Sequence, residues 1–453
     1  MTATFLPAAA SIVAPGDVLE SLAKSQLVDG FPFVLDLERS RGSWLVDQRD
    51  RTSYLDMFGF FASNALGMNH PALAEDGEFL AELGRAAVNK PSNSDVYTTQ
   101  QARFVEVFRR VLGIAELPRL FFIDGGALAV ENALKVAFDW KSQRNEAEGR
   151  FGPDGKPLGA KVLHLTGAFH GRSGYTISLT NTDPAKTDRF PTFDWPRIET
   201  PHTGLDDVPA AEERALAQMR AAFAAHPHDI ACFLCEPVQG EGGDRHMRPQ
   251  FLRAAQDLCH EHDALFVVDE VQTGVGMTGT IWAHLGLGLE PDIVAFGKKT
   301  QVCGIMAGRR VEELKTNATR VSSRINSTWG GNLTDMVRAR RIYEVIEAEN
   351  LVERAARLGE VLLCGLVDLA QRHPGMVENP RGKGLMCAID LPSASIRDAV
   401  VADLFAKEQV AIVGTGERGI RLRPALTVAA EELGLALCAL DRALSRVRTG
   451  ANG

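Results

Sequence analysis

The sequence lacks any apolar run of the roughly 20 residues that a membrane-spanning helix needs. Its N-terminus has no basic segment followed by a continuous apolar stretch, as a signal peptide would have. It also contains no run of lysines and arginines, and the formal net charge of -9 leaves no overall basic surface for phosphate backbones or anionic lipids. We therefore expect a cytoplasmic protein that has neither nucleic-acid nor membrane partners.

Cysteine is sparse and shows no metal-binding pattern. The seven cysteines are an odd number spread along the chain, and the only close pair is Cys232 and Cys235 in the apolar run IACFLCEPV. Three positions apart on a strand, these side chains face opposite sides of the sheet. Because no second CxxC and no HxxxH completes a zinc site, we interpret both as buried thiols and expect no metal.

What the sequence does contain is an alternation of two patterns in its middle part. With 453 residues, 45% hydrophobic and 24% charged, the chain can bury large cores. Short apolar, β-branched segments predict strands, and the stretches between them have helical spacing. This is typical of an α/β domain with a mainly parallel sheet, placed at residues 71–335, whose ligands bind beyond the carboxyl ends of the strands. The predicted strands are RLFFID, KVLHLT, DIACFLCEPV, ALFVVDEV, DIVAFGKK and GIMAGRR.

The two ends of the chain predict a smaller domain. Residues 336–453 begin with one long amphipathic helix over 338–372, followed by the strands GLMCAID and GIRLRP and a terminal helix, which together indicate an α+β domain. Residues 1–70 contain alternating apolar positions, and we expect them to pack beside it. Residues 144–160 are rich in glycine, proline and charge, and they predict an exposed loop.

Two charged residues lie at the ends of predicted strands. Lys298 follows a glycine at the end of DIVAFGKK, where poor solvation and a nearby cation would lower the pKa of its amine and make it a nucleophile for an aldehyde. Asp269 ends LFVVD, where a buried carboxylate needs a cationic partner such as a pyridinium nitrogen. Taken singly, a strand-end aspartate is commonly a cap and a strand-end lysine is commonly exposed.

A third feature is the segment FFIDGGALAVENALK, in which a predicted strand leads into a helix through Asp124, Gly125 and Gly126. Free backbone N–H groups at such a helix start form a cradle for a phosphate group. Glycine turns before helices also occur for packing alone, so this motif gains its weight from the other two features.

The linked pattern resembles class III, or ω-amino-acid, aminotransferases of fold type I over nearly the whole chain. VVDEVQTG followed about 28 residues later by DIVAFGKK carries the resemblance. It implies a pyridoxal 5'-phosphate (PLP) enzyme of the fold type I transferases, with a large α/β domain and a smaller α+β domain. It also implies a homodimer with active sites at the subunit interface.

The resemblance also implies a role for individual residues. Lys298 matches the Schiff-base lysine, and Asp269 the partner of the pyridine nitrogen. The phosphate turn departs from the common Ser-Gly-X-Glu-Ala, which removes a serine contact but keeps the backbone donors. The other implied cofactor contacts are Gln272 at the ring hydroxyl, Phe169 stacked on the ring, Gly126 and Ala127 at the phosphate, and Thr328 reaching the neighbouring subunit's phosphate, with Asn326 at the same boundary.

Within the family, segments such as GAFHGRSGYTISLTNT and NSTWGGNLTDMVRARR are similar to the lysine ε-aminotransferase branch. That branch transfers the ε-amino group of L-lysine to 2-oxoglutarate and forms 2-aminoadipate 6-semialdehyde, which cyclises to a piperideine carboxylate, and L-glutamate. Arg172 is the predicted fork for the lysine carboxylate. Glu241 and Arg421 match a pair in which the glutamate masks the arginine until the keto acid binds, and the glycines around Glu241 would suit a side chain that swings.

Several alternatives stay open. Another ω-aminotransferase, acting on ornithine or 4-aminobutyrate, would use the same residues except for Arg172. A PLP decarboxylase or aminomutase would share the fold. A non-catalytic PLP-binding regulator is disfavoured because no basic helix-turn-helix stretch occurs, and a dehydrogenase because no GxGxxG follows its first strand.

Overall fold

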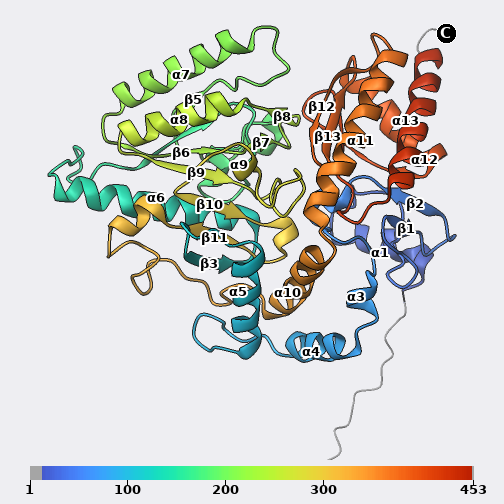
Figure 1. Cartoon of the computed structure of the whole chain (residues 1–453), viewed down its shortest axis with the longest axis horizontal. Helices are drawn as coiled ribbons and strands as arrows, with labels where there is room; N and C mark the ends of the chain where they lie inside the picture. Colours follow the sequence, from blue (N-terminus) through green and yellow to red (C-terminus); the bar gives the residue numbers. More distant parts are fainter. Residues whose placement is uncertain (1–12, 451–453) are drawn as a thin grey trace, which may run out of the picture.

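A computed structural model describes residues 13–450, with side chains up to residue 448. Its centre is a seven-stranded sheet in the order β3-β11-β10-β9-β6-β4-β5, in which all neighbouring strands are parallel except at β11 (Figure 1). The six predicted strands are confirmed, and only the short β5 was missed. The strands are β3 (Arg119–Ile123), β4 (Lys161–Leu165), β5 (Arg197–Ile198), β6 (Ile230–Cys235), β9 (Leu265–Asp269), β10 (Ile293–Phe296) and β11 (Cys303–Ala307).

Helices cover both faces of this sheet. One face packs on α6 (Gly126–Ala147), and the other packs on α8 (Pro249–Glu261) and, at the edge formed by β5, on α7 (Val208–Ala225) (Figure 1). The interior strand β6 is buried along its whole length. Cys232 lies in the core under α6 and Cys235 in the core under α8, so both thiols are buried and face opposite sides, as the strand period predicted.

Helix α6 is longer than its sequence pattern suggested. The segment 144–160 was predicted to be a loop throughout, but the helix continues to Ala147. The reason is a tertiary contact: Asn145 is fully buried, and its side-chain amide donates to the carbonyls of Leu158 and His228. Polar residues of this kind resemble a loop in the sequence until their partners are known.

A second sheet lies on the C-terminal side, in the antiparallel order β12-β13-β16-β15. The single long helix predicted over 338–372 is wrong, because the chain forms two helices that break at Asn350, whose φ is +50°. Asparagine tolerates this left-handed conformation better than most residues do. The elements are α10 (Leu333–Ala348), α11 (Leu351–Arg372), β12 (Glu378–Lys383), β13 (Met386–Asp390), α12 (Ala394–Glu408), β15 (Val413–Thr415), β16 (Gly419–Leu422) and α13 (Ala430–Gly450).

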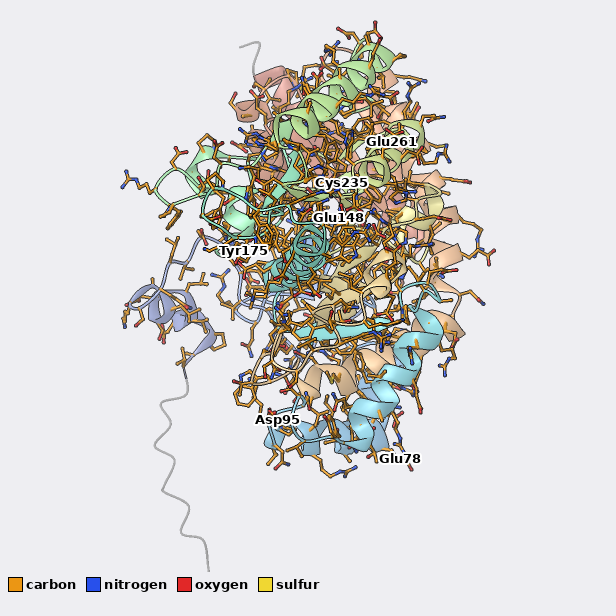
Figure 2. The ribbon with its side chains drawn as sticks, turned by 90° about the vertical axis from the view of Figure 1, so that its left-hand side faces the viewer. Glu78, Asp95, Glu148, Tyr175, Cys235 and Glu261 are labelled. Atoms are coloured by element: carbon orange, nitrogen blue, oxygen red, sulfur yellow. The ribbon has the colours of Figure 1, made fainter. Side chains whose placement is uncertain are left out.

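The N-terminal part pairs with this second region. Strands β1 (Trp44–Val46) and β2 (Ser53–Asp56) form a three-stranded sheet with β14 (Val410–Ala411). This pairing is what a shared small domain would require, whereas the boundaries at residues 70/71 and 335/336 stay predictions. Figure 2 shows one end of the molecule, where Glu78 lies in α4 (Gly77–Val88) and Asp95 lies just before α5 (Thr99–Val111).

The remaining elements are short or connect the two regions. They are η1 (Pro15–Asp17), α1 (Val18–Ala23), α2 (Gly59–Ala62), α3 (Pro71–Ala74), α4 (Gly77–Val88), α5 (Thr99–Val111), η2 (Thr176–Ser178), η3 (Pro184–Lys186), β7 (Val238–Gln239), β8 (Arg245–His246), α9 (Ala283–Gly286), η4 (Lys298–Thr300) and η5 (Arg309–Glu313). None of the helices within residues 13–450 combines the length and the apolar character needed to cross a membrane.

Candidate active site

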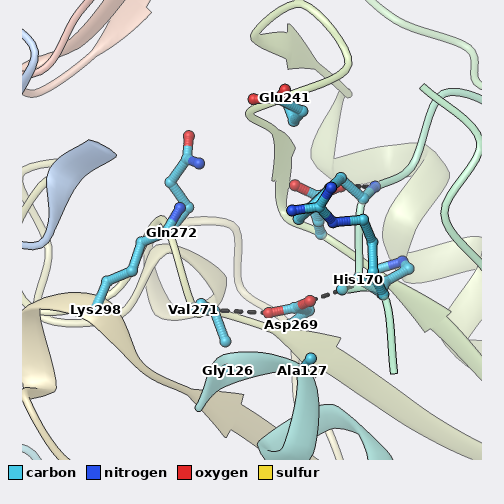
Figure 3. A pocket seen from close by; sticks show the side chains of 12 residues that line it. Gly126, Ala127, His170, Glu241, Asp269, Val271, Gln272 and Lys298 are labelled. Carbon is cyan, nitrogen blue, oxygen red and sulfur yellow. Dashed lines mark hydrogen bonds and ion pairs between the residues drawn. The ribbon is translucent and has the colours of Figure 1, made fainter. Parts of the chain in front are cut away.

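A cavity of about 310 Å³ lies where the central strands end, the place expected for ligands in such a sheet. It is bounded by the segments that follow β4, β6, β9 and β10 and by the start of α6 (Figure 3). Its lining includes eight of the eleven residues predicted for the site. The lining residues are Gly126, Ala127, Phe169, His170, Gly171, Arg172, Glu236, Glu241, Asp269, Val271, Gln272 and Lys298.

Lys298 begins the turn η4 directly after Gly297 and reaches the cavity (Figure 3). Its φ of +53° is unusual for a residue with a side chain, which marks a backbone held by its surroundings. Burial, together with the positive charge of Arg421, lowers the pKa of the Lys298 amine to about 8. A far larger share of this amine is therefore uncharged and nucleophilic near neutral pH than for an ordinary lysine.

Asp269 is the last residue of β9, and its carboxylate is buried at the cavity wall. One oxygen accepts the N–H of Val271 at 3.0 Å, and the other lies 2.8 Å from Nδ1 of His170 (Figure 3). These two contacts hold the carboxylate in one orientation. The pattern of a strand ending in charge pointed to Asp269, but nothing in it pointed to His170.

The cavity floor on one side is the N-terminus of α6. Gly125 has a φ of +100° and turns the chain into the helix, so that Gly126 and Ala127 open its first turn against the cavity. The first N–H groups of a helix have no partner within it, and in a 22-residue helix they carry its positive dipole end. Gly171 packs against this turn so closely that a Cβ would lie 2.4 Å from that of Ala127. The arrangement fits a phosphate group.

Two further side chains in the cavity have the chemistry that an aromatic cofactor needs. Oε1 of Gln272 is buried and has no hydrogen-bond partner among the described residues, so it can accept a hydrogen bond from a ligand. Phe169 is fixed through its backbone N–H, which donates to Glu236 at 3.0 Å. Together with Lys298, Asp269 and the α6 terminus, they supply an amine, a carboxylate, a ring and an anion cradle in one cavity. These residues fit PLP.

Glu236 supports the site by binding two backbone segments beside the cavity. Both of its oxygens accept backbone N–H groups, from Phe169 at 3.0 Å and from Gly240 at 3.1 Å. Burial raises the pKa of this carboxyl to about 7. These contacts make Glu236 a structural support of the site.

Four charged side chains lie in or beside the cavity. Arg172 is exposed, lines the cavity and has no ion-pair partner among residues 13–450. Arg421 of β16 is buried behind Glu241, and its Nη1 donates to Oε2 of Glu241 at 3.0 Å. Glu241 also forms a second ion pair, with Lys186 at 2.7 Å. The sequence did not indicate this second pair.

The swing of the Glu241 side chain stays a prediction, but the glycines on either side of it have a packing role. A Cβ on Gly240 would lie 2.0 Å from Oε1 of Gln272, and one on Gly242 would lie 2.0 Å from the carbonyl of Gly167. Both glycines therefore allow close packing, and the backbone at Glu241 is tightly held.

Thr328 and Asn326 lie outside this cavity. Both are exposed, in a segment where the carbonyl of Trp329 accepts the N–H of Asn93. Their predicted role concerns a neighbouring subunit, and it stays a prediction. Lys299, in contrast, does not line the cavity and donates to the carbonyls of Ala62 and Gln272.

The fold and this cavity define a PLP-dependent aminotransferase. The chain belongs to the class-III aminotransferases, whose family model matches residues 27–444. The predicted family, fold type, enzyme class and cofactor are thereby confirmed. No group of three or more side chains suited to a metal ion occurs among the described residues.

Proteins of known name are similar over almost the full length. The L-lysine-epsilon aminotransferase of Mycobacterium tuberculosis strain H37Rv is 60% identical over 434 residues, 95% of this chain and 96% of the relative. That of Streptomyces clavuligerus is 55% identical over 439 residues, covering 95% and 94%. The solved lysine aminotransferase of M. tuberculosis in the internal aldimine form is 59% identical with a TM-score of 0.93, covering 96% of this chain and 100% of the other.

Proposed function

We propose that the protein transfers the ε-amino group of L-lysine to 2-oxoglutarate as a cytoplasmic homodimer. The products are 2-aminoadipate 6-semialdehyde, which cyclises to a piperideine carboxylate, and L-glutamate. The observation that carries the proposal is the unpaired Arg172 in the same cavity as the Lys298 amine and the Asp269 carboxylate. The names of the two relatives at 55–60% identity support the same substrate.

PLP, when bound, supplies the electron sink that stabilises a carbanion next to the transferred nitrogen. Nζ of Lys298 holds the cofactor and then takes the proton from the ε-carbon of lysine, a role suited to an amine with a pKa of about 8. Asp269, oriented by His170 at 2.8 Å, would pair with the ring nitrogen of the cofactor. The first turn of α6 would hold the phosphate.

The two arginines divide the recognition of carboxylates. An amino acid that reacts through its distant amine must hold its α-carboxylate away from the reacting carbon, and Arg172 offers a planar fork for it at the exposed side of the cavity. 2-Oxoglutarate carries a carboxylate next to its reacting carbon. Arg421 would bind an anion there, provided that Glu241 releases it.

The dimer would complete the site from outside this chain. Thr328 and Asn326 are exposed and remote from their own cavity, which leaves them available to contact a second copy. We expect a dimer by analytical ultracentrifugation, and we expect Thr328→Val to weaken PLP binding without changing the fold. A monomer that binds PLP as tightly as the native protein would contradict this part of the proposal.

The test of the substrate compares amino donors. Purified PLP-loaded protein is given lysine, ornithine or 4-aminobutyrate with 2-oxoglutarate, and glutamate and carbon dioxide are measured. Lysine should give the highest kcat/KM, with glutamate formed and no carbon dioxide released. A better donor than lysine would reject the substrate, and release of carbon dioxide would indicate a decarboxylase.

Arg172→Met sharpens this comparison. Loss of a charged hydrogen-bond pair costs about 1.5–3 kcal/mol, so kcat/KM for lysine should fall about 10- to 100-fold. Cadaverine, which is lysine without its carboxylate, is the matched substrate and should lose much less. Equal losses for both would show that Arg172 does not bind the carboxylate.

A further inference from the structure

The carboxylate of Glu241 is bound by two cations from distant parts of the chain. Its Oε2 accepts from Arg421 on β16 at 3.0 Å, and its Oε1 accepts from Nζ of Lys186 on η3 at 2.7 Å. Burial opposes ionisation of Glu241, but the two cations outweigh it and lower its pKa. Because each cation uses a different oxygen, one contact can break while the other remains.

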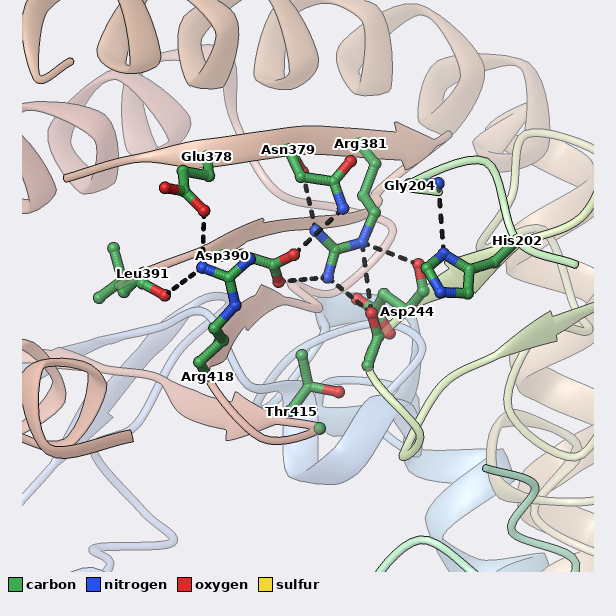
Figure 4. A network of polar contacts seen from close by, with 12 residues as sticks. His202, Gly204, Asp244, Glu378, Asn379, Arg381, Asp390, Leu391, Thr415 and Arg418 are labelled. Carbon is green, nitrogen blue, oxygen red and sulfur yellow. Dashed lines mark hydrogen bonds and ion pairs between the residues drawn. The ribbon is translucent and has the colours of Figure 1, made fainter. Parts of the chain in front are cut away.

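The backbone beside this carboxylate is fixed. Glu241 lies at the tip of the hairpin formed by β7 and β8, and the second region of the molecule binds that tip. The hydroxyl of Thr415 donates to the carbonyl of Gly240 at 2.6 Å, and the N–H of Gly416 donates to that of Glu241 at 3.1 Å. Arg381, whose network of polar contacts is drawn in Figure 4, donates to the carbonyl of Gly243 at 2.6 Å. Any movement of the Glu241 carboxylate is therefore a rotation of its side chain.

The side chains of Arg421, Glu241 and Lys186 differ in how far they are exposed. The side chain of Arg421 is only 4% exposed, while those of Glu241 and Lys186 are 31% and 23% exposed. A ligand carboxylate consequently reaches Arg421 only after Glu241 has left it. Lys186 lies at the same opening, with its Nζ 5.3 Å from the centre of the Phe169 ring.

We propose that Lys186 is the pivot on which the Glu241 carboxylate turns away from Arg421, and hence a positioning residue for the half-reaction with 2-oxoglutarate. If Arg421 were the only partner of the half-buried Glu241 carboxylate, the carboxylate would have no ion pair after leaving Arg421. With Lys186 present, Oε1 stays paired, and the attraction to Lys186 is no longer shared with Arg421. The inference rests on the proposed function only in its choice of keto acid.

The first experiment measures binding without chemistry. Glutarate has the two carboxylates of 2-oxoglutarate but no keto group, so its affinity for the PLP-loaded enzyme can be measured by isothermal titration calorimetry. Lys186→Met keeps most of the aliphatic side chain and removes the charge, and we expect it to weaken glutarate binding about 10-fold, the order of one charged hydrogen bond. Lys186→Arg should restore most of the affinity, and Lys156→Met, at an exposed lysine, should not change it.

The second experiment separates a pivot from general support of the site. Single-turnover rates are measured for the amino donor and for the 2-oxoglutarate half-reaction in the native enzyme and in Lys186→Met. The ratio of the two should shift about 10-fold against 2-oxoglutarate. Equal losses in both half-reactions, or unchanged affinity for glutarate, would overturn the proposal. Failure of lysine as the donor would reject the proposed substrate alone, because exchange between glutamate and 2-oxoglutarate still reports on Lys186.

Discussion

The short turn η4 places one lysine in the cavity and the next one in the packed interior beside it. Lys298 reaches the cavity, whereas the neighbouring Lys299 is 1% exposed and donates at 3.0 Å to the carbonyls of Ala62 and Gln272. Burial lowers the pKa of both amines. A lowered pKa therefore does not identify the reactive lysine, and what distinguishes the two is access to a cavity with a complementary carboxylate.

The largest effect should come from removing the lysine of the cavity. Lys298→Ala eliminates both the attachment of PLP and the proton-transferring amine, so the rate of amino transfer should fall by about 10⁴-fold. The absorption of bound PLP should disappear, while the circular dichroism spectrum should remain native. An unchanged PLP absorption would mean that Lys298 is not the attachment point and would direct attention to Lys299.

Removing the lysine of the interior should instead affect stability. Lys299→Met keeps the apolar part of the side chain but leaves two buried carbonyls without their donor, so the free energy of unfolding should fall by about 1–3 kcal/mol. Urea denaturation of the cofactor-free protein measures this change. Lys315→Met, at an exposed lysine, is the control and should stay within about 0.5 kcal/mol of the native value.

A loss of PLP absorption in Lys299→Met at full stability would reverse the roles of the two lysines. Through Ala62 and Gln272, Lys299 also connects the N-terminal part to the segment after β9. We therefore expect its removal to loosen this junction before the central sheet unfolds, which hydrogen exchange of residues 59–64 would detect.

The sequence allowed most of the cavity to be predicted because its key residues follow buried strands. Asp269 and Lys298 come at the ends of apolar segments, and the carboxyl ends of parallel strands meet at one edge of the sheet. Gly126 was predicted for the same reason, since it opens the helix after β3. Local pattern and parallel topology together brought these three positions to one place.

Contacts between distant segments could not be predicted in this way. The ion pair between Lys186 and Glu241 joins a short turn to a hairpin tip 55 positions away, and neither segment has a periodicity that indicates the other. The buried Asn145 was missed because a polar residue satisfied by tertiary contacts has no signature of its own. The break at Asn350 was missed because a single left-handed residue leaves the helical spacing of the apolar positions almost unchanged. The packing role of the glycines near Glu241 was also missed, because close packing and flexibility call for the same residue type.

The smallest effect that we expect is the pH dependence of the rate of PLP binding. It distinguishes the two lysines within the native chain. Burial and the charge of Arg421 disfavour the cationic form of Lys298 and lower its pKa from 10.5 to about 8, so its uncharged share grows about tenfold per pH unit below pH 8 and levels off above it. The rate at which the cofactor-free protein gains the absorption of bound PLP should follow this curve. Lys299 should add no second step, because it does not line the cavity.

Arg421→Met tests the cause of this shift. Without the arginine's positive charge, the Lys298 cation is less disfavoured, so the midpoint of the pH curve should move upward. Stopped-flow absorbance between pH 6 and pH 10 measures both proteins under the same conditions. A midpoint near the ordinary lysine value in the native chain would show that the cavity does not lower the pKa of Lys298. The distinction between the two lysines would then rest on access alone.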